Sequence, residues 1–207
     1  MPTLSIEQLK RLTLNDITQG HSLLLHEPYR VLESFAGRSN EEKELELINN
    51  LPKKLGCYYL VFRLDALWAN GGFQAVVLDK DIEFNALLLQ ATIEAFDFFG
   101  ALATAALLRE IVPTVVQAAR EIEALVHRDA SDDEFEPIWA RLDSYGTRHK
   151  DAFAEVYPAI LVDIHQRPAD WQLQRPWLPQ SPLVRRRTLY SAVTRFWADR
   201  RVRGLGY

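Results

Sequence analysis

Residues 54–73 constrain the fold more strongly than any other part of the sequence. The spacing predicts a helix over residues 54–69, and apolar side chains occupy nearly its whole circumference. A helix that is apolar all round lies at the centre of a protein. The string Asn70-Gly71-Gly72 follows and predicts a chain reversal, because glycine reaches positive φ without a Cβ clash and asparagine tolerates that region. Trp68 and Phe73 flank the reversal and offer it aromatic rings for packing, so the pattern specifies a shape rather than a reaction.

The rest of the chain continues the helical period, and no stretch shows the sustained alternation of a β-strand. The strings Ser39-Asn40-Glu41-Glu42 and Ser131-Asp132-Asp133-Glu134 have the spacing of capping boxes and predict helix starts. Asp81 is expected to cap another long helix. Pro113 and Pro158 are expected to break helices, because proline lacks an amide hydrogen and clashes with the preceding turn. Together these signals predict an all-α fold, a single compact multi-helix domain.

Charge is distributed unevenly along the 207 residues, although the net charge is only −4. Residues 79–136 contain 13 acidic and 4 basic side chains, whereas residues 167–207 contain 9 basic and 2 acidic ones. We predict an all-helical main domain over residues 1–166, and over residues 167–207 a connector rich in proline and tryptophan followed by a basic C-terminal helix. This helix is expected to pack on the acidic body of its own chain or of a dimer partner. The alternative is that its arginines bind nucleic acid while Trp171 and Trp177 stack on bases.

Composition indicates a globular protein. A hydrophobic content of 48% with 25% charged residues is that of a chain that folds around a packed core. No run reaches the roughly 18 uninterrupted apolar residues of a membrane span, and residues 1–5 lack the order of a signal peptide. The single cysteine, Cys57, excludes an intrachain disulfide. We therefore expect a cytoplasmic protein that does not bind membranes.

No catalytic, cofactor-binding or metal-binding set stands out in the sequence. The five histidines are scattered, and no pair has the spacing with an intervening glutamate that a helical zinc site uses. Gly71-Gly72 lacks the further glycines and the lysine of a phosphate-binding loop. Glu94 and Asp97 suggest an acid and base pair, or half of a two-metal site, which keeps a hydrolase or metal enzyme as an alternative. A solvated polar stripe is the simpler interpretation of that pair, and we predict no enzymatic activity and no cofactor.

Two acidic clusters are the candidate partner-binding residues. The first consists of Glu41, Glu42, Glu44 and Glu46, and the second of Asp129, Asp132, Asp133, Glu134 and Glu136. Acidic residues at helix starts are ordinarily explained by their favourable interaction with the helix dipole and by solvation. The sharper interpretation is that both clusters lie on one face and present rows of negative charge like those of a DNA backbone.

Residues 58–108 resemble a bacterial DNA-mimic protein family that was long catalogued as a domain of unknown function. Its hallmark is an Asn-Gly-Gly-Phe turn after an apolar helix with paired tyrosines, and this chain has Tyr58-Tyr59 and then Asn70-Gly71-Gly72-Phe73. Gln74 and the later Gly100-Ala101 also match, as do Thr104-Ala105 and Leu107-Leu108. The resemblance implies an all-α fold, no enzymatic activity, and binding to a transcription regulator so that DNA is excluded from it.

The leading hypothesis is therefore a non-enzymatic, cytoplasmic protein-binding module. Residues 1–166 would form a DNA-mimic-like domain whose acidic face occupies the basic, DNA-binding surface of a transcription regulator. An immunity or antitoxin-like protein is the alternative within the binding class. Nucleic acid itself is expected as a partner only through the arginine-rich tail, and a homodimer remains open.

Overall fold

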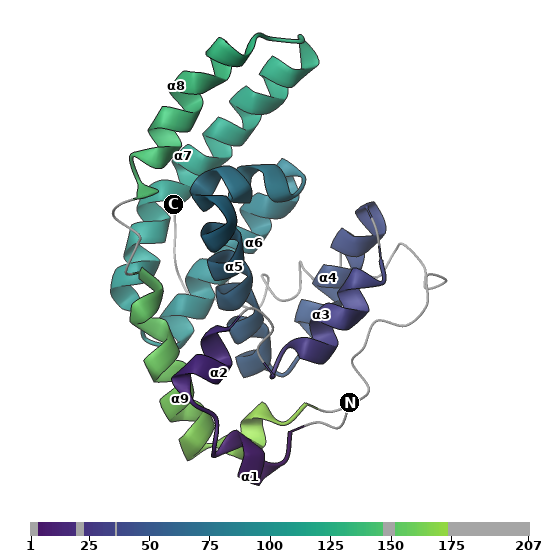
Figure 1. Ribbon diagram of the computed structural model, residues 1–207, viewed down its shortest axis with the longest axis vertical. Helices are drawn as coiled ribbons and strands as arrows, with labels where there is room; N and C mark the ends of the chain where they lie inside the picture. The colour runs from purple at the N-terminus through teal and green to yellow at the C-terminus, as the bar shows by residue number, and fades with distance from the viewer. Residues whose placement is uncertain (1–3, 20–22, 36, 147–151, 174–207) are drawn as a thin grey trace, which may run out of the picture.

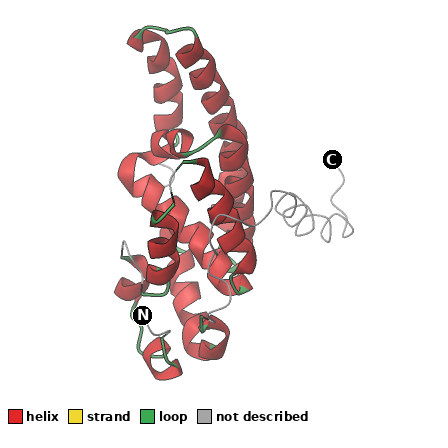
Figure 2. Cartoon of the chain, turned by 90° about the vertical axis from the view of Figure 1, so that its right-hand side faces the viewer, coloured by secondary structure: helices red, strands yellow, loops and turns green. Residues whose placement is uncertain are grey.

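The described part of the chain, in a computed structural model, is built from helices joined by short connections (Figures 1 and 2). The structure describes residues 4–19, 23–35, 37–146 and 152–173, and these ranges contain no strand. The α-helices are α1 (Ile6–Leu9), α2 (Leu14–Thr18), α3 (His26–Glu33), α4 (Arg38–Asn50), α5 (Lys53–Asp79), α6 (Ile82–Phe98), α7 (Leu102–His127), α8 (Asp132–Asp143) and α9 (Val156–Gln166). Short 3₁₀ helices span Ala152–Ala154 and Pro168–Trp171. The predicted all-α fold is confirmed.

The helix α5 lies at the centre of the molecule, as its apolar circumference predicts. It packs against α6 and also contacts α4, α7 and α8. The side chains of the consecutive residues 58–61 are all buried, and four consecutive residues point to every side of a helix. The Tyr58 hydroxyl donates a hydrogen bond of 2.5 Å to the backbone carbonyl of Ile17, which ties α2 to this central helix.

The helices α7 and α8 form a hairpin that projects from the rest of the molecule, at the top of Figure 1. The expectation that Pro113 breaks a helix is wrong, because Pro113 lies inside α7, which is a continuous helix of 26 residues. Pro113 is exposed, so water can bind the carbonyl group that its missing amide hydrogen leaves without a partner. The hairpin therefore contains one uninterrupted long helix and one shorter helix.

The helix α7 is long and apolar enough to cross a membrane when judged by length and composition alone. The core helices of globular proteins often pass the same test. In the structure Leu108, Ile111 and Val115 are buried on its inner side, and α7 packs extensively on α6. Packing within the protein therefore accounts for the apolar residues on its inner side.

Two of the predicted helix starts are confirmed, and a second predicted helix break is not. Asp81 caps α6 by accepting hydrogen bonds from the amides of Glu83 and Phe84, and Ser131 forms the predicted capping box at the start of α8. Pro158 does not break a helix, because it lies in the first turn of α9, where backbone amides lack helical partners.

The predicted capping box at Ser39 is also wrong. The helix α4 begins one residue earlier, at Arg38, and its N-cap is Gly37, which adopts a φ of 58° that few other residues reach without strain. Ser39 is therefore already inside the helix. The Asn40 side chain donates hydrogen bonds to the carbonyl groups of Leu32 and Phe35, so it joins α4 to the end of α3.

The last described residues are fixed to the helical body through Trp171. Its side chain is 1% exposed, and its indole Nε1 donates a hydrogen bond of 2.8 Å to Asp163 on α9. Lys54 at the start of α5 forms ion pairs with both Asp163, at 2.7 Å, and Asp170, at 2.9 Å. Trp177 and the predicted basic C-terminal helix lie outside the described residues.

Candidate functional site

The string Asn70-Gly71-Gly72-Phe73 forms a sharp kink inside α5, at the position where we expected the chain to reverse. Gly72 has φ 61° and ψ −146°, a combination that is essentially restricted to glycine. The helix resumes immediately after it and runs to Asp79. Trp68 and Phe73 pack edge to face across the kink, with ring centroids 4.3 Å apart. Gly100, a later residue of the matched pattern, has φ 77° in the turn between α6 and α7.

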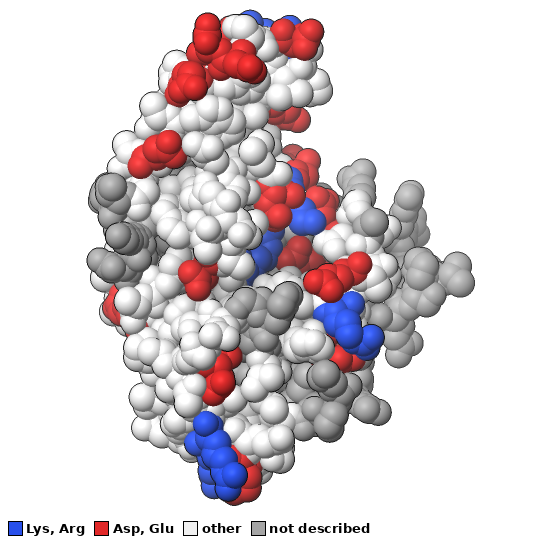
Figure 3. Space-filling view, viewed as in Figure 1, with Lys and Arg blue, Asp and Glu red and all other residues white. Residues whose placement is uncertain are grey.

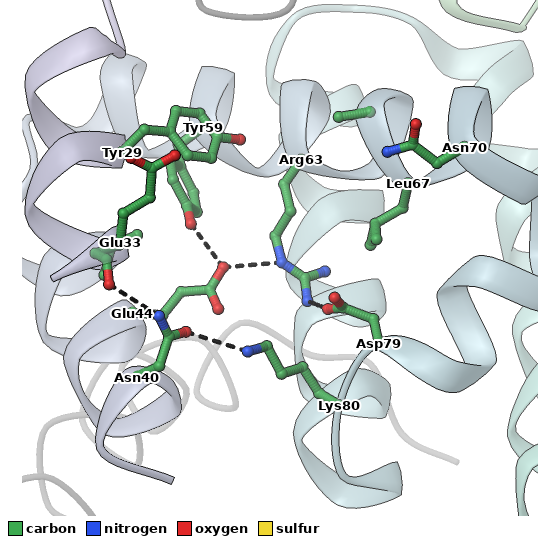
Figure 4. A pocket seen from close by; sticks show the side chains of 12 residues that line it. Tyr29, Glu33, Asn40, Glu44, Tyr59, Arg63, Leu67, Asn70, Asp79 and Lys80 are labelled. Carbon is green, nitrogen blue, oxygen red and sulfur yellow. Dashed lines mark hydrogen bonds and ion pairs between the residues drawn. The ribbon is translucent and has the colours of Figure 1, made fainter. Parts of the chain in front are cut away.

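The kink brings the two segments of α5 together through an ion pair. Arg63 from the first segment pairs with Asp79, the last residue of the second segment. The Nε of Arg63 donates a hydrogen bond of 2.8 Å to Oε1 of Glu44 on α4, and the Tyr59 hydroxyl donates one of 2.6 Å to the same atom (Figure 4). We call Glu44, Tyr59, Arg63 and Asp79 the kink network.

The kink network is held in a poorly solvated environment. Burial raises the pKa of the Tyr59 hydroxyl well above its usual value, and the negative charge of Glu44 raises it further. Burial likewise raises the pKa of Tyr29, whose ring lies 5.4 Å from that of Tyr59. Both hydroxyl groups are therefore protonated at neutral pH, and Tyr59 acts as a hydrogen-bond donor to Glu44.

Charged residues inside a central helix need partners, and both such residues of α5 have them. Arg63 is held by the kink network. Asp65, on the other side of the helix, accepts a hydrogen bond of 2.6 Å from the Tyr157 hydroxyl of α9. Burial raises the pKa of Asp65, and the bond from Tyr157 opposes this effect. These two charges therefore connect α5 to α4 and to α9.

The first candidate acidic cluster is not the row of surface charge that we expected. Glu44 is only 3% exposed and points inward to Tyr59 and Arg63, so it is not a partner-binding residue. Its buried carboxylate is stabilised by those two donors. Glu46 is half-buried and pairs with Lys43 at 2.7 Å. Glu41 is half-buried as well, which leaves Glu42 as the one fully exposed carboxylate of this cluster.

The second candidate acidic cluster lies on the surface of the protein. Its members Asp129, Asp132, Asp133, Glu134 and Glu136 are all exposed. They surround the tip of the α7–α8 hairpin, where Figure 3 shows red side chains gathered at the top of the molecule. We call these five residues the acidic tip.

Most carboxylates of the acidic tip have no cation beside them. Glu134 pairs with Arg128 and completes the capping box with Ser131, and both contacts lower its pKa. Among the described residues no ion pair involves the other four members of the tip. Figure 1 also places the tip well away from α4, so the two acidic clusters do not form one continuous surface.

The alternative catalytic pair, Glu94 and Asp97, does not form a recognisable site. Asp97 pairs with Arg109 of α7, and both Glu94 and Asp97 are half-buried on the outer side of α6. Within the described ranges no group of three or more histidine, cysteine, aspartate or glutamate side chains is arranged to hold a metal ion. His149 lies outside those ranges.

The fold and the acidic tip define an all-α protein that displays its negative charge on a projecting hairpin. A family model described as DMP19-like protein matches residues 49–173, which is more than half of the chain. The chain therefore belongs to the DMP19-like family, a family of DNA-mimic proteins. No curated protein and no solved structure gives a significant match.

The matched range separates the two candidate acidic clusters. It contains the kink and the acidic tip, whereas Glu41 to Glu46 lie before its first residue. It also ends at residue 173, so it includes Trp171 and continues past Arg167, where we expected the shared region to stop. The family match thus covers the central helix and the helices that follow it, up to Trp171.

Sequence reasoning missed the kink network, although one signal for it was present. Tyr59 and Arg63 are four residues apart, a spacing that places both on the same face of a helix. Two polar groups on one face of an otherwise buried helix require a common partner. That partner, Glu44, was assigned to the surface because its neighbours in sequence are acidic.

Proposed function

We propose that this protein is a non-enzymatic, cytoplasmic protein-binding module whose acidic tip occupies the DNA-binding surface of a regulator. Membership of the DMP19-like family supports the general role of a DNA mimic. One observation assigns the proposed role to particular residues: five carboxylates are exposed at the end of a projecting hairpin. Four of these carboxylates form no ion pair with any described residue. The proposal therefore rests on the acidic tip alone and not on both acidic clusters.

The geometry of α8 suits contact with a row of basic side chains. Phe135, Ile138 and Leu142 face the body of the protein, so the opposite side of α8 is directed outward. Asp133 and Glu136, three residues apart, are exposed away from that inward side. With a rise of about 1.5 Å per residue, carboxylates at such spacings form a line of negative charge along the helix. A DNA duplex offers its partners a denser line of the same sign.

Electrostatic complementarity of this kind acts mainly on association. Charges at the edge of an interface raise the association rate and favour partners of opposite charge, and salt weakens both effects. A hairpin that projects from the body can present its charges without steric interference from the rest of the molecule. We therefore expect a partner with a concave basic surface, such as a cleft that holds duplex DNA in a DNA-binding protein.

Capture from the native cell tests the proposal. The full chain, immobilised, should retain a DNA-binding protein that salt releases. The variant Asp132→Asn, Asp133→Asn, Glu136→Gln should bind it about tenfold more weakly. A matched variant with the same change in net charge, Glu7→Gln, Glu41→Gln, Glu42→Gln, should bind it like the wild type. Equal loss in both variants would show that overall charge, and not the acidic tip, is responsible.

A further inference from the structure

A pocket lies between α3, α4 and the kinked α5 (Figure 4). Its volume is about 230 Å³, several times the roughly 30 Å³ that one water molecule occupies in the liquid. It is smaller than the pockets of about 300 to 1,000 Å³ that bind drug-sized molecules. The pocket is therefore of a size for a small metabolite, and no residue of the acidic tip lines it.

The charges that line the pocket balance one another. Glu44 and Asp79 are the acidic residues, and both bind Arg63. Lys80 supplies the second cation, and its Nζ donates a hydrogen bond of 3.1 Å to the Asn40 side chain. Glu33 also lines the pocket, but it is exposed at the rim, where water screens its charge. A ligand with net charge would leave one charge of this half-buried set uncompensated, so the pocket favours a molecule that is neutral overall.

The walls of the pocket favour a flat ring. Tyr29 and Tyr59 line one side, and their rings are tilted by 32° with centroids 5.4 Å apart. Leu32 and Leu67 line it as well, and Leu67 is partly buried against the core. Aromatic and aliphatic walls of this kind bind the faces of planar ring systems.

Polar groups are available for the edge of such a ring. Tyr59 and Arg63 both bind Oε1 of Glu44, and Figure 4 shows the second carboxylate oxygen of Glu44 turned toward the side where Lys80 lies. Lys80 brings an ammonium group to that side. Asn70 places an amide, both donor and acceptor, at the rim. The pocket thus offers both donors and acceptors beside an apolar wall.

We propose that this pocket binds a neutral, planar heterocycle with a donor and acceptor edge, the chemical class of nucleobases and nucleosides. The ring lies against Tyr29 and Leu67, and its polar edge meets Glu44, Lys80 and Asn70. The assignment also gives Asn70 of the Asn-Gly-Gly-Phe string a role that the kink alone does not require. It is independent of the partner-binding role of the acidic tip.

Calorimetric titration of the full chain with the free nucleobases and nucleosides tests the assignment. At least one of them should bind with a dissociation constant of about 1 mM or lower. Leu67→Trp, which fills the pocket, should abolish this binding, and Asn70→Ala should weaken it at least threefold. Asn49→Ala, an exposed asparagine of α4 away from the pocket, should leave binding unchanged, and circular dichroism should report the same helical content for each variant.

Three results would overturn the assignment. One is the absence of binding by every nucleobase and nucleoside at millimolar concentration. Another is binding that persists unchanged in Leu67→Trp, which would place the ligand elsewhere on the protein. The third is tighter binding of the negatively charged nucleoside monophosphates than of the neutral compounds, which would show that the charge balance does not select the ligand.

Discussion

The acidic tip and the kink network place the same residue types, aspartate and glutamate, in opposite environments. At the tip the carboxylates are exposed, and four of the five form no ion pair with any described residue, whereas in the kink network Glu44 and Asp79 are bound to Arg63 and are buried or half-buried. Exposed carboxylates contribute little to stability and remain available to a partner. A buried carboxylate contributes through its donors and is costly when one of them is removed. The comparison teaches that an acidic stretch in a sequence can either lie exposed on the surface or be drawn into the interior by donors from a neighbouring helix.

The largest effect should follow from removing the cation of the kink network. Arg63→Met leaves Glu44 buried without its ion pair, and we expect the free energy of unfolding to fall by about 3 to 5 kcal/mol. Urea denaturation followed by circular dichroism measures the change. Arg120→Met, at an exposed position of α7, is the matched control and should change stability by less than about 0.5 kcal/mol. Similar losses of unfolding free energy in Arg63→Met and Arg120→Met would contradict the claim that Arg63 stabilises the protein through its buried partner Glu44.

The kink itself should be the next most sensitive feature. Gly72→Ala places a Cβ on a backbone with φ 61° and ψ −146°, which costs about 1 to 3 kcal/mol in strain, although no atom lies within 4 Å of the added carbon. Gly146→Ala also adds a methyl group in open space, but at a residue without positive φ. The melting temperatures of the two variants are compared by thermal unfolding. Only Gly72→Ala should lower the melting temperature, because only its backbone is strained by a Cβ. Equal melting temperatures would mean that the kink is not strained by alanine.

Alkaline pH should act on the kink network and leave the acidic tip unaffected. The pKa of Tyr59 is raised in the folded protein, so the stability that this group contributes is present below its ordinary pKa of about 10 and is lost as pH rises above it. Wild-type protein should therefore lose stability more steeply than Tyr59→Phe above pH 10. Unfolding free energies at a series of pH values measure this, and parallel curves for the two proteins would argue against a buried Tyr59 donor.

The smallest effect on stability is expected at the acidic tip. Neutralising Asp132, Asp133 and Glu136 removes only solvated charges and their weak interaction with the α8 dipole, so the free energy of unfolding should change by less than about 1 kcal/mol. A larger loss, measured by urea denaturation, would show that these carboxylates are structural. A small change combined with weaker partner binding would separate binding from folding.

Much of the fold could be predicted from the sequence because its signals are local. The helical period, the Asp81 cap and the Ser131 capping box depend on residues within one or two turns of each other. The error at Pro113 arose because the effect of a proline depends on whether the freed carbonyl group reaches water, which the tertiary packing decides. Glu44 was misplaced for a similar reason, since its donors Tyr59 and Arg63 are 15 and 19 residues away along the chain.

Competition with DNA tests the central claim most directly. A captured DNA-binding partner is loaded with its fluorescent duplex, and the full chain is titrated in while anisotropy reports the bound DNA. The account predicts that wild-type protein releases the duplex, that the variant Asp132→Asn, Asp133→Asn, Glu136→Gln needs about tenfold more protein to do so, and that Glu7→Gln, Glu41→Gln, Glu42→Gln behaves like wild type. A partner that binds this protein and its DNA at the same time would contradict the account.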